Sequence, residues 1–153
     1  MLPTDTMANR LQLDRFLPYR LSITSNLVSG RIARVYESLF GLSIPEWRLI
    51  TVVAEAGAIT QAELGERTRM DKVSVSRAAI ALVGRGLLAR TPNTNDRRSH
   101  LLSLTDEGEA LYASVAPKAI EIEQRLFSRF TPAELETFTT MLRRIDAAVQ
   151  EEA

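Results

Sequence analysis

The sequence predicts a mostly α-helical fold with one small β-hairpin, and three observations in the middle of the chain support this fold class. Thr60 is followed three residues later by Glu63, which is the spacing of a capping box at a helix start. Asp71 is a good N-cap for a second helix about ten residues further on. Two short segments, Leu87–Arg90 and His100–Leu104, then have the length of paired strands. Two helices across a tight turn, followed by such a wing, form a winged helix-turn-helix.

The second of these helices is expected to have one packing face and one face suited to DNA. At about 100° per residue, apolar side chains gather on one side, and small, polar and cationic side chains gather opposite. The second kind of face can approach the floor of a major groove, because small residues avoid collisions while Ser and Arg donate hydrogen bonds. Gly86 then ends the helix. The packing side holds Val75, Ala78, Ala79 and Leu82, and the opposite side holds Val73, Arg77, Ala81 and Gly84.

Two further helices are expected before this unit. Pro18 suits a first helical turn, and the apolar period after it continues until Gly41. Ser43 and Glu46 form another capping box, so a second helix begins there. The segment 1–14 is polar and lacks a persistent apolar period, which predicts a mobile arm or a short lead-in helix. The buried stripe expected for the second helix consists of Trp47, Ile50, Val53 and Ala54.

The chain after the hairpin is expected to form two more helices. Thr105 should cap the first of them, and Pro117 should bend or interrupt it. Thr131, Pro132 and Glu134 start the second, as an N-cap, an N1 proline and a capping-box glutamate. That last helix has the seam pattern of a helix packed on another helix. The seam consists of Leu135, Phe138, Leu142, Ile145 and Val149.

The apolar stripes of these outer helices need a cover, and the sequence leaves two alternatives open. The helices fold back as a bundle within one chain, or they intertwine with a second copy. A dimer would place two DNA-reading helices roughly 34 Å apart, about one turn of DNA, and would therefore select a palindromic operator.

Charge is distributed unevenly along a chain whose net charge is zero. Between Thr60 and His100 there are eight basic and four acidic residues, so this segment carries an excess of four positive charges and the remainder an equal negative excess. A basic segment on an acidic body is the pattern expected when one face of a protein meets phosphate.

Several classes of protein are disfavoured by what the sequence lacks. There is no Cys, which excludes disulfides and thiolate metal sites. We find no Gly-rich phosphate loop, no nucleophile motif and no His-Glu cluster at metal spacing, so we expect neither an enzyme nor a bound cofactor or metal. No apolar run is long enough to span a membrane and no export signal is recognised, which favours a cytoplasmic protein.

Several segments resemble the MarR family of bacterial transcription regulators, over nearly the whole chain from about Phe16 to Val149. The most specific is the run Asp96-Arg97-Arg98-Ser99 followed by Leu102-Ser103-Leu104-Thr105-Asp106-Glu107-Gly108, an Asp-x-Arg wing tip that continues through a strand into Leu-Thr-x-x-Gly. The other matching segments are Ile44-Pro45-Glu46-Trp47-Arg48, Thr60-Gln61-Ala62-Glu63-Leu64, and Val73 and Ser74 with Arg77.

The resemblance implies a homodimer in which N- and C-terminal dimerisation helices pair the subunits. It also implies a palindromic operator, a mostly repressing action, and release of DNA when a small, often phenolic, compound binds between the dimer helices and the DNA-reading unit. On this interpretation the chain divides into an N-terminal arm and dimerisation helix (1–42), a winged helix-turn-helix DNA-binding domain (43–104) and C-terminal dimerisation helices (105–153).

By the same match, the wing arginine that enters the minor groove is Arg98, braced by Asp96, and Arg97 contacts phosphate. A guanidinium at a hairpin tip suits a narrow, electronegative minor groove. More ordinary interpretations also remain: a solvated charged turn, a turn-forming Asp96, and serines that only serve the start of the helix. The match assigns the contacts on the helix itself to Lys72, Ser74, Ser76 and Arg77.

An effector site is harder to infer, because core aromatics and surface arginines give the same pattern as a ligand pocket. Aromatic walls and cations suit a carboxylate or phenolate. His100 is also compatible with an ordinary strand residue. The candidates are Tyr19, Arg20, Tyr36, Trp47, Arg48 and His100.

The function expected from the sequence is a homodimeric repressor of a palindromic operator that is released by a small aromatic acid or its CoA thioester. The alternatives are a ligand-independent regulator or activator, and a winged-helix protein-interaction module that does not bind DNA. The paired Arg97 and Arg98 favour DNA, because a protein-binding module has no need of a basic wing tip beside a cationic helix.

Overall fold

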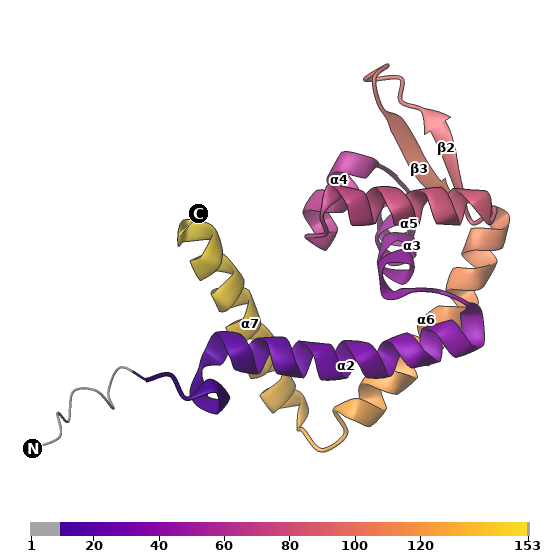
Figure 1. Ribbon diagram of the computed structural model, residues 1–153. Helices are drawn as coiled ribbons and strands as arrows, with labels where there is room; N and C mark the ends of the chain where they lie inside the picture. The colour runs from indigo at the N-terminus through magenta and orange to yellow at the C-terminus, as the bar shows by residue number, and fades with distance from the viewer. Residues whose placement is uncertain (1–9, 153) are drawn as a thin grey trace, which may run out of the picture. The chain divides into compact units, whose positions relative to one another are not determined.

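The computed structural model describes residues 10–152, and Figure 1 shows the path of the chain. The fold is mostly helical with a small antiparallel sheet, which confirms the predicted fold class. The segment predicted as an arm or lead-in helix falls partly on residues 1–9, outside the described part. The elements in order are η1 (Leu13–Arg15), α2 (Leu17–Phe40), α3 (Ile44–Ala56), β1 (Ala58–Thr60), α4 (Gln61–Thr68), α5 (Lys72–Gly84), β2 (Leu88–Pro92), β3 (His100–Leu104), α6 (Asp106–Leu126) and α7 (Pro132–Glu152).

The chain divides into two compact units, and the boundary lies within α6, between Tyr112 and Ala113. The first unit therefore includes everything from η1 to the first turns of α6, and the second includes the rest of α6 and α7. No helix among residues 10–152 is both long enough and apolar enough to cross a membrane.

The helix starts follow the capping residues that the sequence predicts. At α3, the Glu46 backbone N–H donates to Ser43 Oγ at 3.3 Å and the Ser43 N–H donates to Glu46 Oε1 at 3.1 Å. The same reciprocal pair of bonds, 3.1 and 3.0 Å long, joins Thr131 and Glu134 at the start of α7. Each bond satisfies a backbone donor that the first helical turn leaves unpaired.

The sheet has three strands in the order β1-β3-β2, where the sequence predicted only two. Strand β1 pairs antiparallel with β3, with Ile59 opposite Leu102. Strand β2 pairs with the other edge of β3 and continues to Pro92, two residues beyond the predicted end. A strand as short as β1 has no readable alternation between buried and exposed residues, and it forms because β3 offers an edge.

Helix α5 has the two faces that its sequence predicts. Its packing residues, Val75, Ala78, Ala79 and Leu82, are all buried. They contribute to a core that also holds Leu49, Ile50 and Val53 of α3. The residues on the opposite side, Val73, Arg77, Ala81 and Gly84, are all exposed.

The Leu-Thr-x-x-Gly segment fixes the start of α6 against the end of α5. The Thr105 hydroxyl donates to the Gly86 carbonyl at 2.6 Å and accepts from the Gly108 N–H at 3.0 Å. A Cβ atom on Gly108 would lie far inside van der Waals contact of the Leu87 carbonyl oxygen, so only glycine fits there. Helix α6 then continues through Pro117, so of the predicted bend or interruption the interruption does not occur.

The second unit differs from the first in burial. No residue of α7 is buried. In its apolar seam, Phe138 is 46%, Ile145 39% and Val149 65% exposed, and only Leu135 and Leu142 are partly covered.

Candidate nucleic-acid interface and ligand pocket

The N-terminus of α5 is organised by Asp71 and Ser74. Asp71 Oδ1 accepts the Ser74 backbone N–H at 2.7 Å, and Oδ2 accepts the Ser74 hydroxyl at 2.9 Å. These bonds, the backbone bond foremost, hold the pKa of the Asp71 carboxyl below its ordinary value. Because the Ser74 hydroxyl hydrogen is engaged by Asp71, Ser74 keeps only its oxygen lone pairs for an outside partner.

The other predicted reading residues of α5 lie on its uncovered side. Lys72 and Arg77 are exposed and Ser76 is partly exposed. Val73 and Ile80 add two large apolar side chains to this surface, 58% and 61% exposed. Ile80 was not predicted from the sequence, although an apolar residue outside the packing period of the helix indicates an exposed apolar side chain.

The wing tip between Asn93 and Ser99 is held by its own hydrogen bonds. The Asn93 side-chain amide donates to Ser99 Oγ at 3.1 Å, and the Ser99 N–H donates to the Asp96 carbonyl at 3.2 Å. Asp96 Oδ1 accepts the backbone N–H of Arg98 at 3.0 Å. Asp96 therefore acts on the backbone of Arg98, where the sequence analysis assigned it to bracing the side chain. The side chains of Arg97 and Arg98 are exposed.

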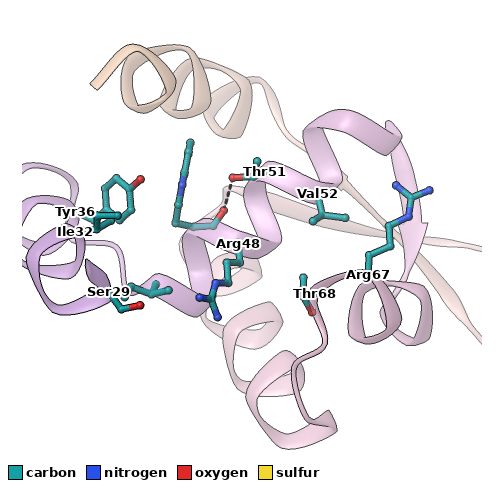
Figure 2. Close-up of a pocket in the computed structure, with 10 residues that line it drawn as sticks. Ser29, Ile32, Tyr36, Arg48, Thr51, Val52, Arg67 and Thr68 are labelled. Atoms are coloured by element: carbon teal, nitrogen blue, oxygen red, sulfur yellow. Dashed lines mark hydrogen bonds between the residues drawn. The ribbon is translucent and has the colours of Figure 1, made fainter. Parts of the chain in front are cut away.

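A cavity of about 450 Å³ lies against α2, α3 and the end of α4. In Figure 2, Tyr36 lies at one end of this pocket, Arg67 at the other, and Arg48 between them. The pocket brings together three of the predicted effector residues, Tyr36, Trp47 and Arg48. Its volume is in the range of small-ligand sites. The lining residues are Ser29, Ile32, Tyr36, Ile44, Trp47, Arg48, Thr51, Val52, Arg67 and Thr68.

Aromatic rings form one wall of the pocket. The centroids of Tyr36 and Trp47 are 5.4 Å apart at an angle of 46°, and Tyr112 of α6 stacks on Trp47 at 5.9 Å and 20°. Burial raises the pKa of the Tyr36 hydroxyl, which therefore stays un-ionised at neutral pH. Tyr112 was not predicted to lie here, because nothing in the sequence places α6 beside α3.

The remaining predicted effector residues lie elsewhere in the first unit. Arg20 contacts Asp14 at 3.2 Å, near the start of α2. Tyr19 precedes Ser29 by about 15 Å along that helix. His100 is exposed at the start of β3, opposite Pro92. None of the three lines the cavity.

Arg67 and Thr68 are pocket residues that the sequence analysis missed. Arg67 adds a second guanidinium to that of Arg48, and each suits a carboxylate or phenolate. The Thr68 hydroxyl donates to the Leu64 carbonyl at 2.6 Å, so towards a ligand it offers an acceptor. Only the packing of α4 on α3 brings these residues to the site. Within residues 10–152, no cluster of three or more His, Cys, Asp or Glu side chains could hold a metal ion.

Comparison with known protein families gives one match. Residues 40–99, which include α3, the helix-turn-helix and most of the wing, match the sequence profile of the MarR family. An uncharacterized protein of Mycobacterium tuberculosis is 31% identical over 124 residues, which cover 81% of this chain and 84% of that relative.

Solved structures share the fold over almost the whole chain. A MarR/EmrR family transcriptional regulator from Acinetobacter sp. ADP1 has a TM-score of 0.85 at 25% identity, covering 92% of this chain and 99% of that one. A MarR variant from Escherichia coli complexed with operator DNA has a TM-score of 0.78 at 25% identity, with coverages of 90% and 99%. Bordetella bronchiseptica BpsR, whose DNA binding is regulated by 6-hydroxynicotinic acid, has a TM-score of 0.82 at 22% identity, with coverages of 90% and 98%, which shows a shared fold.

Proposed function

Since the chain belongs to the MarR family of transcriptional regulators, we propose that it is a homodimer that represses a palindromic operator until a small aromatic acid or its CoA thioester binds. The family regulates transcription and does not catalyse reactions. The observation that carries the proposal is the two-sided character of α5. Its apolar face is buried in the first unit, while Lys72 and Arg77 remain uncovered on the other face, together with small residues and the apolar Val73 and Ile80.

DNA contact is proposed at two places in the first unit. On α5, Lys72, Ser76 and Arg77 would face the major groove, while Ser74 mainly holds the cap with Asp71. At the wing, the exposed Arg98 would enter the minor groove and Arg97 would contact phosphate. The complex of the related E. coli MarR variant with operator DNA supports this assignment.

The homodimer is proposed because α7 has an apolar seam and no buried residue. Such a seam is stable in water only when another surface covers it. A second copy would cover it symmetrically and would present two α5 helices to a palindromic site. The three-part division of the chain into 1–42, 43–104 and 105–153 belongs to this proposal.

The effector site is proposed to be the pocket lined by Tyr36, Trp47, Arg48 and Arg67. Stacking on Trp47 would hold an aromatic ring, and the arginines would bind its carboxylate. The regulation of BpsR by an aromatic acid supports this class of effector.

DNA binding is tested by mobility shift on the DNA upstream of the protein's own gene, at two salt concentrations. We expect a shift that scrambled DNA does not give, with a log-log salt slope of about −0.9 for each phosphate contact. Arg98→Ala should weaken binding by about 1 to 3 kcal/mol. Arg34→Ala removes an equal charge from the exposed side of α2 and is the matched control.

The result against DNA binding would be equal affinity for operator, scrambled DNA and every genomic fragment tested. A winged-helix module that binds protein would then be the better interpretation. Equal affinities of wild type and Arg98→Ala would remove only Arg98 from the interface.

The effector pocket is tested through the fluorescence of Trp47, the only tryptophan in the chain. Titration with 6-hydroxynicotinic acid and a panel of hydroxybenzoates should quench Trp47 saturably and release the operator. Arg48→Ala should abolish both effects. Arg20→Ala, which lies outside the pocket, should leave both unchanged.

A further inference from the structure

The two main walls of the pocket are joined by one short turn. Helix α2 contributes Ser29, Ile32 and Tyr36, and α3 contributes Ile44, Trp47 and Arg48. Between the two helices lie only residues 41–43. Gly41 ends α2 in the left-handed conformation, with φ of 62°, and the Leu42 N–H donates to the carbonyl of the pocket residue Tyr36 at 3.2 Å. Any change in the angle between α2 and α3 must therefore move this turn.

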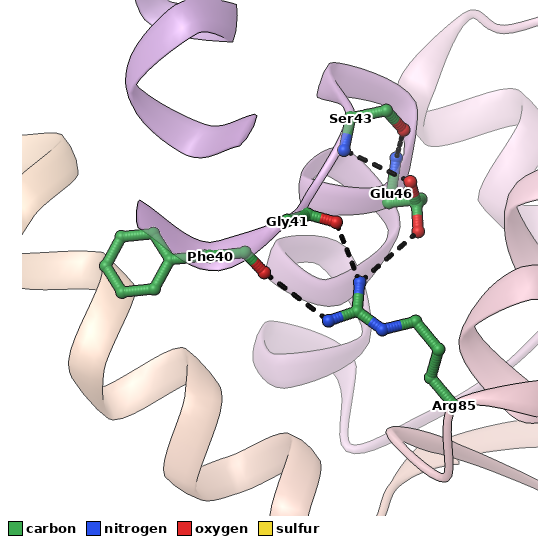
Figure 3. A network of polar contacts seen from close by, with 5 residues as sticks. All are labelled: Phe40, Gly41, Ser43, Glu46 and Arg85. Carbon is green, nitrogen blue, oxygen red and sulfur yellow. Dashed lines mark hydrogen bonds and ion pairs between the residues drawn. The ribbon is translucent and has the colours of Figure 1, made fainter. Parts of the chain in front are cut away.

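Arg85 holds the turn from the far end of α5. Its Nη1 donates to the Gly41 carbonyl at 2.9 Å and its Nη2 to the Phe40 carbonyl at 3.4 Å. Nη1 also lies 3.8 Å from Glu46 Oε2. Figure 3 shows the guanidinium reaching all three acceptors from one side.

These contacts join three helix ends. The Phe40 and Gly41 carbonyls lie at the negative end of α2, where the helix itself supplies no donor and a cation is favourable. Glu46 is the capping-box glutamate of α3, and its other oxygen accepts the Ser43 N–H. Arg85 itself is the C-cap of α5, where its own N–H donates to the Ala81 carbonyl at 3.0 Å.

The contacts of Arg85 are weak enough to rearrange when the turn 41–43 moves. The Arg85 side chain is 42% exposed and that of Glu46 16%, so solvent screens the ion pair and the contacts exchange at low cost. The guanidinium is a planar fork, so it can hold two carbonyls only when the turn has one geometry.

We propose that Arg85 is the positioning residue that couples the effector pocket to the DNA-reading helix. In this mechanism, a ligand that changes the spacing of α2 and α3 moves the turn 41–43, and Arg85 transmits the movement to the C-terminal end of α5. The Glu46 carboxylate keeps Arg85 in register with the first turn of α3, next to Trp47. The inference rests on the proposed function, because it requires both the pocket and the DNA-reading role of α5.

Thermodynamic linkage makes this coupling measurable without knowing the natural effector. If the pocket alters α5, then DNA on α5 must alter the pocket by the same coupling free energy. Trp47 lines the pocket, adjoins Glu46 in the sequence and is the only tryptophan. A single 5-fluorotryptophan label therefore gives one ¹⁹F resonance that reports the pocket alone.

The experiment titrates the labelled full-length protein with operator DNA, which is the fragment upstream of its own gene or one recovered from genomic DNA by the purified protein. Anisotropy of fluorescein-labelled operator measures DNA binding, and the ¹⁹F resonance of Trp47 measures the pocket. The variants are Arg85→Gln, Arg85→Lys and Glu46→Gln. Arg34→Gln is the charge-matched control on α2.

We expect saturation with operator to shift the Trp47 resonance in the wild type and in Arg34→Gln. Arg85→Gln and Glu46→Gln should lose most of this shift, even at DNA concentrations that saturate them. Arg85→Lys should keep part of it, since an ammonium keeps the charge and can donate to these carbonyls but lacks the fixed planar fork of the guanidinium. A merely structural role would lower the melting temperature and the affinity, but would leave the shift at saturation unchanged.

Two results would overturn the inference while leaving the proposed function intact: specific operator binding without any shift of Trp47 in the wild type, or a full shift in Arg85→Gln at saturation. Absence of specific operator binding by the wild type would overturn the proposed function, and the coupling with it.

Discussion

The segment from Leu42 to Leu102 and helix α7 differ sharply in burial, although both carry regular apolar patterns. In the described part of the chain, all buried apolar residues except Tyr36 and Val115 lie between Leu42 and Leu102. Helix α7 buries none of its residues, yet its seam is as regular as the packing face of α5. A periodic pattern thus identifies which face of a helix is apolar, but it does not identify what covers that face.

The segment from Leu42 to Leu102 thus carries its own core, whereas α7 buries no residue, and we propose that a second copy covers its seam. Four substitutions or conditions test this difference between the two regions, and their expected effects range from several kcal/mol to a small change in pH dependence.

The largest effect is expected from Leu49→Ala in α3. Leu49 is fully buried, and truncating a leucine in a core lowers the free energy of unfolding by about 2 to 5 kcal/mol. Leu27→Ala on α2 is the matched control, because Leu27 is 70% exposed and should change little. Urea denaturation followed by circular dichroism compares the two. Equal losses would mean that the winged unit has no core of its own.

Next is Ile145→Asp in the seam of α7. If a second copy covers this seam, an unpaired carboxylate there should weaken the dimer by about 3 kcal/mol, because burying a charge without a partner is costly. Ala147→Asp places the same charge off the seam and should leave the dimer intact. Sedimentation equilibrium measures both dissociation constants. A dimer unchanged by Ile145→Asp would move the interface elsewhere.

Gly108→Ala should destabilise the first unit by about 2 kcal/mol, because the new methyl group collides with the Leu87 carbonyl. Gly30→Ala in α2 meets no atom within 4 Å and should instead stabilise by about 0.5 to 1 kcal/mol. Thermal melts of the two variants should therefore shift in opposite directions. A shift in the same direction would show that the close approach at Gly108 relaxes freely.

The smallest effect concerns Asp71 and pH. Its pKa is lowered in the folded state, so the stability it contributes is present above its ordinary value of 3.8 and is lost as the pH falls through the folded value. Asp71→Asn keeps a capping side chain but does not titrate. Melting temperatures measured from pH 7 to pH 3 should fall more steeply for the wild type than for Asp71→Asn. Parallel curves would show that other carboxyl groups dominate acid unfolding.

Local features were predictable from the sequence, because a cap and the helix that it starts are neighbours in the chain. Thr60 and Asp71 accept the backbone N–H groups of Glu63 and Ser74 as expected. Strand β1 was not predictable, since its three residues become a strand only by pairing with β3.

The candidate site was predictable only in part, for a similar reason. The proposed DNA-reading residues of α5 and the wing arginines were selected from one continuous segment, and their role stays a prediction. Tyr36, Trp47 and Arg48 were selected for their chemistry, but Arg67 reaches the same pocket only through the packing of α4, and Tyr112 reaches Trp47 only through the packing of α6. The Arg85–Gly41 contact spans 44 residues, and no local pattern indicates it.

The wing tip has a practical consequence that follows from its self-contained hydrogen bonding. Asn93 bonds to Ser99 through both backbone and side chain, and Asp96 orders the backbone within that loop. The segment from Asn93 to Ser99 is therefore a self-contained loop that needs only strands β2 and β3 to hold its two ends. Under the proposed function, exchanging it for the tip of another regulator would change which minor groove is preferred while leaving the scaffold and the proposed major-groove contacts of α5 in place.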